Sequence, residues 1–256
     1  MSNSPKILLT SPINVVKSYV IYEWLDYIKK LDYDNYEIFM VDNSPKPDFS
    51  EKIRDLGFNC VWDDPKGREA RYSIASSNER TRIKFLAGDY QFFFNVECDL
   101  FPPKNIIDKL LSHDKDVVGT TYWSGLGYKT FLQLFTLYNQ HTDFQKHEKI
   151  YKTRRLTFQE SQLFMDGQCK PVYANGMGCI LIKRWVLENI LFHIEPDDTG
   201  YADSFFHRDL WRQGIENYVD TSIIPLHKNS NWDTVLNDTG HKLLSIKRNE
   251  LKQMEK

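Results

Sequence analysis

Residues 90–103 read YQFFFNVECDLFPP, an apolar run that leads into two carboxylates, Glu97 and Asp99. Such a run is typical of a central parallel strand covered on both faces. The pair Pro102-Pro103 cannot continue a strand, so we expect the carboxylates at its C-terminal end, where open α/β sheets bind ligands. Alternate side chains of an extended segment share a face, so Glu97 and Asp99 can converge on one Mg²⁺ or Mn²⁺ ion. The alternative is a pair of acids that only ends a strand and faces water.

Strand-like and helix-like segments alternate through the first half of the chain, which predicts βαβ units and a mostly parallel sheet. The expected strands there are 6–10, 36–42, 59–62, 91–96 and 116–123, and the expected helices are 15–31, 50–56, 73–87 and 104–111. The second half is less regular. It is expected to hold strands at 154–165, 179–183 and 222–226 and helices at 185–191 and 203–213.

The bulk composition is that of an ordinary globular protein. With 256 residues, of which 41% are hydrophobic, the chain can bury a sizeable core. We expect one catalytic domain over 1–230, with a nucleotide-binding half to about 123 and an acceptor half from about 124, and a helical tail over 231–256. No apolar run is long enough to span a bilayer and no signal peptide is evident, which predicts a cytoplasmic protein without stable membrane insertion.

The charge and the cysteine content limit which partners, metal sites and disulfides we expect. The formal charge of −2 gives no field that would draw in nucleic acid, although residues 146–155 are locally basic and either face water or meet an anionic partner. The four cysteines are scattered without a CxxC pair, so neither a zinc site nor a disulfide framework is indicated.

The order of these segments resembles that of glycosyltransferases of the GT-A fold. The resemblance covers roughly residues 6–230 and rests on the βαβ start, on FFFNVECDLFPP, on ANGMGCILIKR and on YADSFFHRDLWRQGIENYVDTSIIPLH. It implies an α/β fold with a Rossmann-like, mostly parallel sheet flanked by helices and a smaller mixed acceptor-side region. It also implies a nucleotide-sugar donor, a hydroxyl acceptor and a divalent metal, Mn²⁺ or Mg²⁺.

The resemblance assigns the metal and the general base. The triplet Glu97-Cys98-Asp99 matches the family's acid-x-acid metal motif, and His227 matches a histidine that completes the metal shell or contacts the diphosphate. Asp203 matches the carboxylate that serves as general base, although Ala202 stands where the family has glutamate. At a helix N-terminus we expect the pKa of Asp203 to be lowered. The alternatives are a structural His227 and an Asp203 that only caps its helix.

Donor-binding residues follow from the same resemblance. Thr10 and Pro12 end the first strand, and Asp42 ends the second, where it matches a carboxylate that contacts the nucleoside. A turn-forming role for Asp42 is the alternative. Arg71 and Asn78 precede the acid-pair strand, where related enzymes direct polar and cationic groups toward the donor.

Acceptor-side residues complete the set. Asn175, Gly176 and Gly178 match a loop whose bare backbone lies against the sugar, with a β-bulge as the alternative. Trp123 can stack on a sugar or base, although core packing is the default for an aromatic residue.

The resulting interpretation is a metal-dependent, inverting glycosyltransferase. Its acceptor is a glycan, a protein, a small molecule or a hydroxymethylated DNA base. Two alternatives stay open: a nucleotidyltransferase that acts on sugar phosphates, and a sugar- or nucleotide-binding descendant of the fold that has lost turnover.

Overall fold

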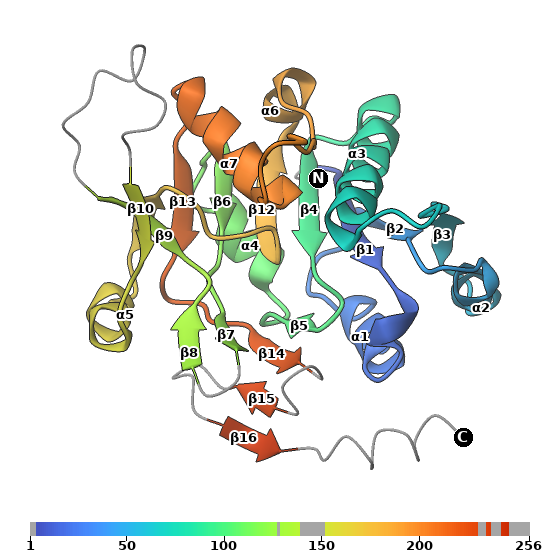
Figure 1. The fold of residues 1–256 in the computed structure, drawn as a ribbon, viewed down its shortest axis with the longest axis horizontal. Coiled ribbons are helices and arrows are strands. Elements are labelled where there is room, and N and C mark those ends of the chain that lie inside the picture. The colour runs from blue at the N-terminus through green and yellow to red at the C-terminus, as the bar shows by residue number, and fades with distance from the viewer. Residues whose placement is uncertain (1–3, 127–128, 139–151, 230–233, 237–241, 246–256) are drawn as a thin grey trace.

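The computed structural model describes residues 4–126, 129–138, 152–229, 234–236 and 242–245 (Figure 1). Its centre is an eight-stranded sheet in the order β11-β13-β6-β12-β4-β1-β2-β3. The strands are β1 (Ile7–Ile13), β2 (Tyr36–Asp42), β3 (Asn59–Trp62), β4 (Phe92–Val96), β6 (Val117–Gly119), β11 (Cys169–Val172), β12 (Cys179–Lys183) and β13 (Asn217–Asp220). Pairing is parallel from β3 through β2 and β1 to β4, and β12 and β11 run the other way. This is the mostly parallel α/β sheet that the alternating pattern predicts.

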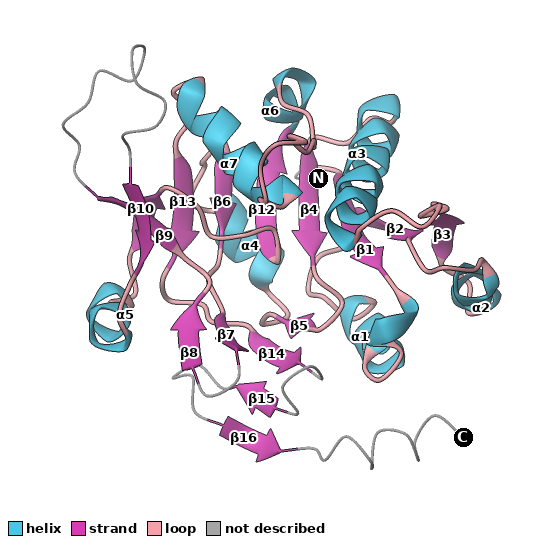
Figure 2. Ribbon diagram, in the orientation of Figure 1, coloured by secondary structure: helices cyan, strands magenta, loops and turns pink. Residues whose placement is uncertain are grey.

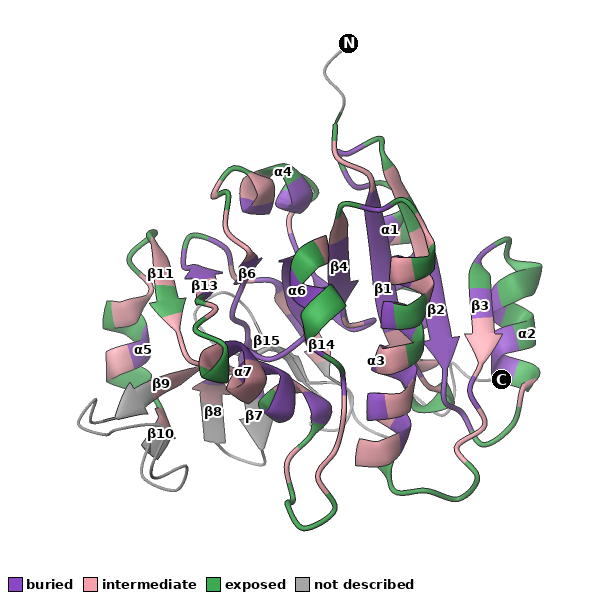
Figure 3. Cartoon of the chain, turned by 90° about the horizontal axis from the view of Figure 1, so that it is seen from above, coloured by how far each residue is buried: buried purple, intermediate pink, exposed green. Residues whose placement is uncertain are grey.

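Helices cover both faces of the sheet because its central strands are apolar on both sides. Ile7 and Leu9 of β1 pack with residues of α1 (Ile21–Ile28), α2 (Asp48–Asp55) and α4 (Ile106–Leu111). Leu8, between them, packs on the other face with α3 (Ala70–Ala87), α6 (Arg184–Asn189) and α7 (Ala202–Arg212). Seen from above, the central strands are buried and the outer sides of α2 and α6 are exposed (Figure 3).

Among the described residues, three smaller sheets adjoin the large one, and the four-stranded one lies at the carboxyl end of β4 (Figure 2). The largest of them has the order β16-β15-β14-β5 and joins β5 (Leu100–Phe101) to β14 (Leu226–Asn229), β15 (Thr234–Leu236) and β16 (Lys242–Ser245). The other two are two-stranded antiparallel sheets. One pairs β7 (Trp123–Leu126) with β8 (Lys129–Leu132), and the other pairs β9 (Phe135–Tyr138) with β10 (Lys152–Arg155). The pairing of His227 with Leu100 brings β14 beside the segment that follows Glu97 and Asp99.

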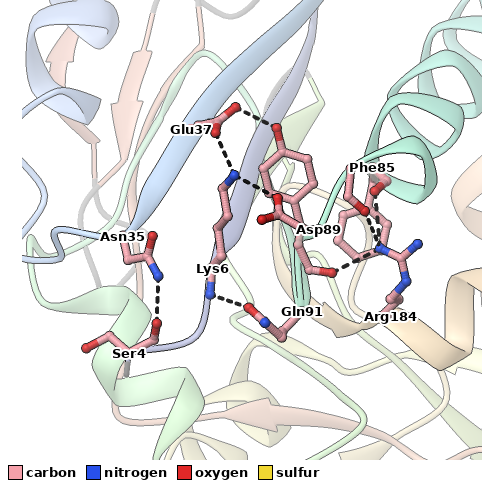
Figure 4. Close-up of polar contacts among 10 residues, drawn as sticks. Ser4, Lys6, Asn35, Glu37, Phe85, Asp89, Gln91 and Arg184 are labelled. Atoms are coloured by element: carbon pink, nitrogen blue, oxygen red, sulfur yellow. Dashed lines mark hydrogen bonds and ion pairs between the residues drawn. The ribbon is translucent and has the colours of Figure 1, made fainter. Parts of the chain in front are cut away.

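Charges at the opposite, amino-terminal edge of the sheet are closely paired (Figure 4). The Lys6 Nζ lies 2.9 Å from a carboxylate oxygen of Glu37 and 2.7 Å from one of Asp89. The Arg184 guanidinium donates to carbonyls at the end of α3, those of Leu86 at 2.7 Å and Gly88 at 2.9 Å. A cation there satisfies carbonyls that a helix end leaves without partners.

Three expected elements of the chain are wrong in detail. The strand expected over 116–123 is divided into β6 and β7, with residues 120–122 between them. The single helix expected over 15–31 is divided into a 3-10 turn, η1 (Val15–Lys17), and α1. The turn forms because Asn14 caps it, accepting from the Val16 N–H at 3.1 Å. The strand expected over 154–165 ends at Arg155 and is followed by helix α5 (Phe158–Phe164), which a capping box of Thr157 and Glu160 starts.

Two further corrections concern the end of the chain. The strand expected over 222–226 is wrong over 222–225, which link β13 to β14, and β14 begins only at Leu226. A turn opens this link, in which Asp220 accepts from the Ser222 N–H at 2.8 Å. The helix expected in the tail is wrong over 234–236 and 242–245, which form strands β15 and β16, while the remaining residues of 231–256 lie outside the described residues. Of the basic segment 146–155, only β10 is described.

Candidate active site

A cavity of about 900 Å³ opens at the carboxyl ends of β1, β2, β3 and β4. This is where an open α/β sheet binds its ligand. Its walls are the loops after these strands, the start of α3, the start of α7 and residues near β9 and β10. They include Pro12, Asn14, Lys17, Asn43, Asp64, Asn78, Asn95, Glu97, Asp99, Gln133, Phe135, Arg155, Met177 and Asp203.

The acid pair lies in a turn rather than in an extended strand. The Leu100 N–H donates to the Glu97 carbonyl at 2.9 Å, and β5 begins only after this turn. Both carboxylate residues still line the cavity, and Cys98 between them, which belongs to the hydrophobic core, also borders it. The expected convergence is therefore present, and a turn produces it instead of strand alternation.

Asp99 is almost fully buried, at 1% exposure, and its two oxygens have different surroundings. Its Oδ2 atom meets the ammonium of Lys17, the Nε2 atom of His227 at 3.4 Å and the hydroxyl of Tyr19 at 3.4 Å. Its Oδ1 atom is buried without a hydrogen-bond partner among the described residues. Burial alone would raise the pKa of Asp99, but His227 and Lys17 outweigh burial and hold the pKa below its usual range.

His227 is held in one orientation by its surroundings. The Nδ1–H donates to the Trp123 carbonyl at 2.8 Å, which directs Nε2 toward Asp99. The Tyr122 ring meets the imidazole edge to face, with centroids 5.3 Å apart. A backbone carbonyl on one nitrogen of a histidine commonly fixes the other nitrogen as a metal ligand.

Glu97 lines the same cavity as Asp99 and Asp203. Burial raises its pKa to about 7, and the charges of Asp99 and Asp203 add to that effect. Lys17 and His227 oppose it. The ionised form of Glu97 is therefore unfavourable in the ligand-free protein, and a bound cation would stabilise it.

Asp203 lies in the first turn of α7 and lines the cavity. Its own carboxylate accepts from the Ser204 N–H at 2.8 Å. The expected lowering of its pKa is wrong: burial raises the pKa, and it outweighs the hydrogen bonds at the helix N-terminus and the charge of Arg155. A carboxylate of raised pKa is a stronger base than an exposed one.

The donor set fits a divalent cation that shares its ligands with a substrate. Asp99 offers a buried oxygen without a partner, Glu97 lines the same wall, and His227 presents Nε2. Within the described residues, no three His, Cys, Asp or Glu side chains meet closely enough to enclose an ion by themselves. Mg²⁺ and ions like it usually keep water and phosphate ligands, so an open site of this kind suits them.

The predicted donor residues divide into two groups. Pro12 and Asn78 line the cavity. Thr10 is buried beneath it and donates to Asn95 Oδ1 at 3.2 Å. Asp42 is fully buried outside the lining and accepts from the Ser44 N–H at 2.9 Å, the geometry of the turn-forming alternative. The Arg71 guanidinium is also outside the lining and donates to the Asp198 carbonyl.

The predicted acceptor-side residues lie outside the lining of the large cavity. Asn175 is buried, where it donates to the Thr120 carbonyl at 3.0 Å. A Cβ on Gly178 would lie 2.4 Å from the Tyr122 ring, so the close backbone approach is to Tyr122. Gly176, with φ +73°, lines a second, smaller cavity. The Trp123 ring is 2% exposed and packs on Phe158, as core packing predicts.

Several cavity residues were missed by sequence reasoning. Lys17 and Asn14 lie in a segment expected to be a helix, and Asn43 adjoins the residue chosen instead. Arg155, from β10, lies over two aromatic rings, with its Cζ 3.8 Å from the Phe131 centroid and 4.8 Å from that of Phe135. Only its basic neighbourhood signalled a role.

A second cavity of about 190 Å³ adjoins the first and shares Phe135, Asp203 and Ser204 with it. His207 lines this cavity one turn beyond Asp203 and is 1% exposed. Burial lowers the pKa of His207 to about 4, an effect that the backbone of Gly176 partly offsets. His207 is therefore a neutral side chain at physiological pH.

Comparison with solved structures places this geometry in a known fold. The crystal structure of GalNAc-T7 with UDP, GalNAc and Mn²⁺ matches at a TM-score of 0.62 and 14% identity, over 91% of this chain and 46% of that one. The mannosyltransferase PcManGT from Pyrobaculum calidifontis, in complex with GDP-Man and Mn²⁺, matches at 0.50 and 16%, over 87% and 57%. The crystal structure of A197 from STIV matches at 0.50 and 15%, over 95% of both chains. The α/β fold with its large, mostly parallel sheet is thus the fold of GT-A glycosyltransferases.

The chain spans about half the length of the two glycosyltransferase chains. No protein-family model matches this sequence, and no curated protein matches it either. Among the residues that the structure describes, no helix is both long and apolar enough to cross a membrane.

Proposed function

We propose that this protein is a divalent-metal-dependent glycosyltransferase, which moves a sugar from a nucleoside diphosphate sugar to a hydroxyl acceptor with inversion. The observation that carries the proposal is one cavity with two chemically different acidic ends. At one end Asp99 is buried with an oxygen that lacks a partner, and at the other end Asp203 has a raised pKa. Two carboxylates whose surroundings give them different pKa values often have different catalytic roles.

The donor end would hold the diphosphate against the loop after β1 and the acidic turn. Glu97, Asp99 and His227 would hold a bound Mg²⁺ or Mn²⁺, which supplies positive charge to the leaving diphosphate. Asn78 and Asn43 line the adjoining wall, where amide groups can hydrogen-bond a nucleoside. Pro12 lines it from the end of β1.

At the acceptor end, Asp203 would take the proton of the acceptor hydroxyl. The acceptor oxygen then forms a bond to the anomeric carbon while the bond from that carbon to the diphosphate breaks. The nucleoside diphosphate leaves with the electron pair of the broken bond. Attack opposite the leaving group gives inversion. Arg155 and Phe135 line this end and provide a cationic and an aromatic surface for the acceptor.

A panel of nucleotide sugars, each with Mn²⁺ or Mg²⁺, tests this proposal. Thermal stabilisation and release of nucleoside diphosphate are measured for the wild type and for Asp99→Asn. Asp89→Asn is the matched control, because Asp89 is an exposed carboxylate at the opposite edge of the sheet. We expect slow hydrolysis of one donor, which Asp99→Asn lowers at least about 10²-fold and Asp89→Asn retains. Release of pyrophosphate from a nucleoside triphosphate instead would favour nucleotidyl transfer, and binding without release would favour a non-catalytic role.

A further inference from the structure

Lys17 already supplies a positive charge to Asp99, the carboxylate that we propose as a ligand of the divalent cation. Its ammonium contacts the Oδ2 atom of Asp99, and both residues line the large cavity. The Lys17 side chain is 28% exposed and the Asp99 side chain 1%, so the lysine is the partner with freedom to leave. Resemblance to known enzymes assigned no role to this lysine.

The backbone that carries Lys17 is fixed on the loop after β2. The Ser44 hydroxyl accepts from the Val15 N–H at 2.7 Å, and the Asn14 amide donates to Asn43 Oδ1 at 2.7 Å. Lys17 therefore starts from a defined point in the cavity wall. Its flexible four-carbon stem lets the ammonium exchange one anionic partner for another without backbone movement.

We propose that Lys17 is an internal competitor of the divalent cation: it neutralises Asp99 in the metal-free protein and moves to the donor diphosphate when donor and metal bind. This inference rests on the proposed function, from which it takes the diphosphate and the metal. One positive charge cannot serve the carboxylate and the diphosphate at full strength at once. Without nucleotide, the metal must therefore displace Lys17 from Asp99. When a diphosphate is bound, Lys17 pairs with the diphosphate instead, and the affinity of the site for the metal rises.

The first test uses Mn²⁺ alone, followed by electron paramagnetic resonance without any nucleotide. Lys17→Met removes the competing charge and is expected to lower the Kd for Mn²⁺ about tenfold or more. Lys17→Arg keeps the charge and is expected to stay near wild type. Lys228→Met is the matched control, because that lysine is 25% exposed and pairs with Glu23 outside the cavity lining. An unchanged or higher Kd in Lys17→Met overturns the proposal, and so does a lack of Mn²⁺ binding in every variant.

The second test uses UDP and GDP as probes, measured by titration calorimetry. Without metal, Lys17→Met is expected to weaken binding of the nucleoside diphosphate about tenfold. With nucleotide present, the Kd for Mn²⁺ is expected to fall by a larger factor in the wild type than in Lys17→Met, because coupling between two ligands is reciprocal. Equal factors in both proteins overturn the proposal.

Two precautions keep the outcomes separate. Lys17→Gln, which retains a hydrogen-bond donor for Asp99, repeats both measurements if Lys17→Met does not fold. The Mn²⁺ titration decides the role of Lys17 even if no nucleotide sugar is turned over. Conversely, turnover that depends on Asp99 supports the proposed function even if the affinity for Mn²⁺ does not respond to Lys17.

Discussion

Charged groups have different surroundings at the two ends of the strands of the large sheet, which we call its amino-terminal edge and its carboxyl edge. At the amino-terminal edge, Lys6 and Arg184 each meet carboxylates or carbonyls, and these groups are partly exposed (Figure 4). At the carboxyl edge, Asp99, Glu97 and Asp203 gather around one cavity, with burial opposing the charge of each. The charged groups at the amino-terminal edge are paired, whereas at the carboxyl edge burial disfavours ionisation and Asp99 Oδ1 has no hydrogen-bond partner among the described residues.

This difference indicates where a ligand belongs. Buried polar groups in folded proteins are normally satisfied, so an orphaned carboxylate oxygen such as Asp99 Oδ1 needs an explanation. A cation and an anionic substrate would supply the missing partners. Substitutions at the carboxyl edge should therefore affect turnover more than stability, and substitutions at the amino edge should do the reverse.

The largest effect is expected for Asp203→Asn. Loss of the base should lower turnover about 10²- to 10⁴-fold, while the Kd of the donor stays close to wild type. Steady-state kinetics and calorimetry measure the two quantities. The control is Asp209→Asn on the same helix, where the carboxylate pairs with His193 at 2.7 Å. Equal losses of turnover in both variants would contradict a chemical role for Asp203.

The raised pKa of Asp203 also predicts a pH dependence. Because the base must be deprotonated, the acid limb of the turnover profile should lie above the ordinary aspartate pKa of about 3.9. The raised pKa of Asp203 lowers the stability of the folded protein at neutral pH. Because the unfolded chain holds this proton less tightly than the folded protein does, ionisation of Asp203 lowers the free energy of unfolding above the ordinary aspartate pKa. Asp203→Asn should therefore unfold no more readily than the wild type at pH 7, and clear destabilisation would contradict the account.

The next largest effect concerns His207 and acid stability. Its pKa is about 4 in the folded protein, below its ordinary value of about 6.5, so the unfolded chain binds the proton more tightly. The contribution to stability is complete above about pH 6.5 and falls by roughly 3 kcal/mol as the pH drops to 4. Urea unfolding across this range should show a weaker loss in His207→Met than in the wild type. Parallel curves would refute the buried, neutral histidine.

A smaller effect is expected at the amino edge. Arg184→Gln removes donors from the carbonyls that end α3 and should lower the free energy of unfolding by about 2 kcal/mol. Turnover of the remaining folded protein should be unchanged, because Arg184 is remote from the cavity lining. A stable Arg184→Gln variant with impaired turnover would reverse the proposed division between the edges.

Local pattern predicted much of the first half of the fold and the acids of the site. Apolar runs marked β1, β2 and β4, and the order of motifs marked Glu97, Asp99, Asp203 and His227, which the structure brings to one cavity or its border. Their roles stay predictions. Those residues follow strands or start a helix, so their positions along the chain carry information about their positions in space.

The missed features depend on contacts that local sequence does not encode. Lys17 reaches Asp99 because η1 is fastened to the loop after β2, and Arg155 reaches the cavity through the pairing of β10 with β9. The burial that raises the pKa of Asp203 comes from packing around α7, whereas the sequence showed only a helix N-terminus. The break between β13 and β14 depends on one turn at Asp220.

The most direct test of the central claim is donor hydrolysis in the presence of Mn²⁺ by wild type, Asp99→Asn and Asp89→Asn, scored as release of nucleoside diphosphate. We expect that one nucleotide sugar is cleaved, that Asp99→Asn loses at least about 10²-fold of this rate and that Asp89→Asn loses none. An Asp99→Asn variant that cleaves the donor at the wild-type rate would show that this enzyme does not depend on a metal held by Asp99.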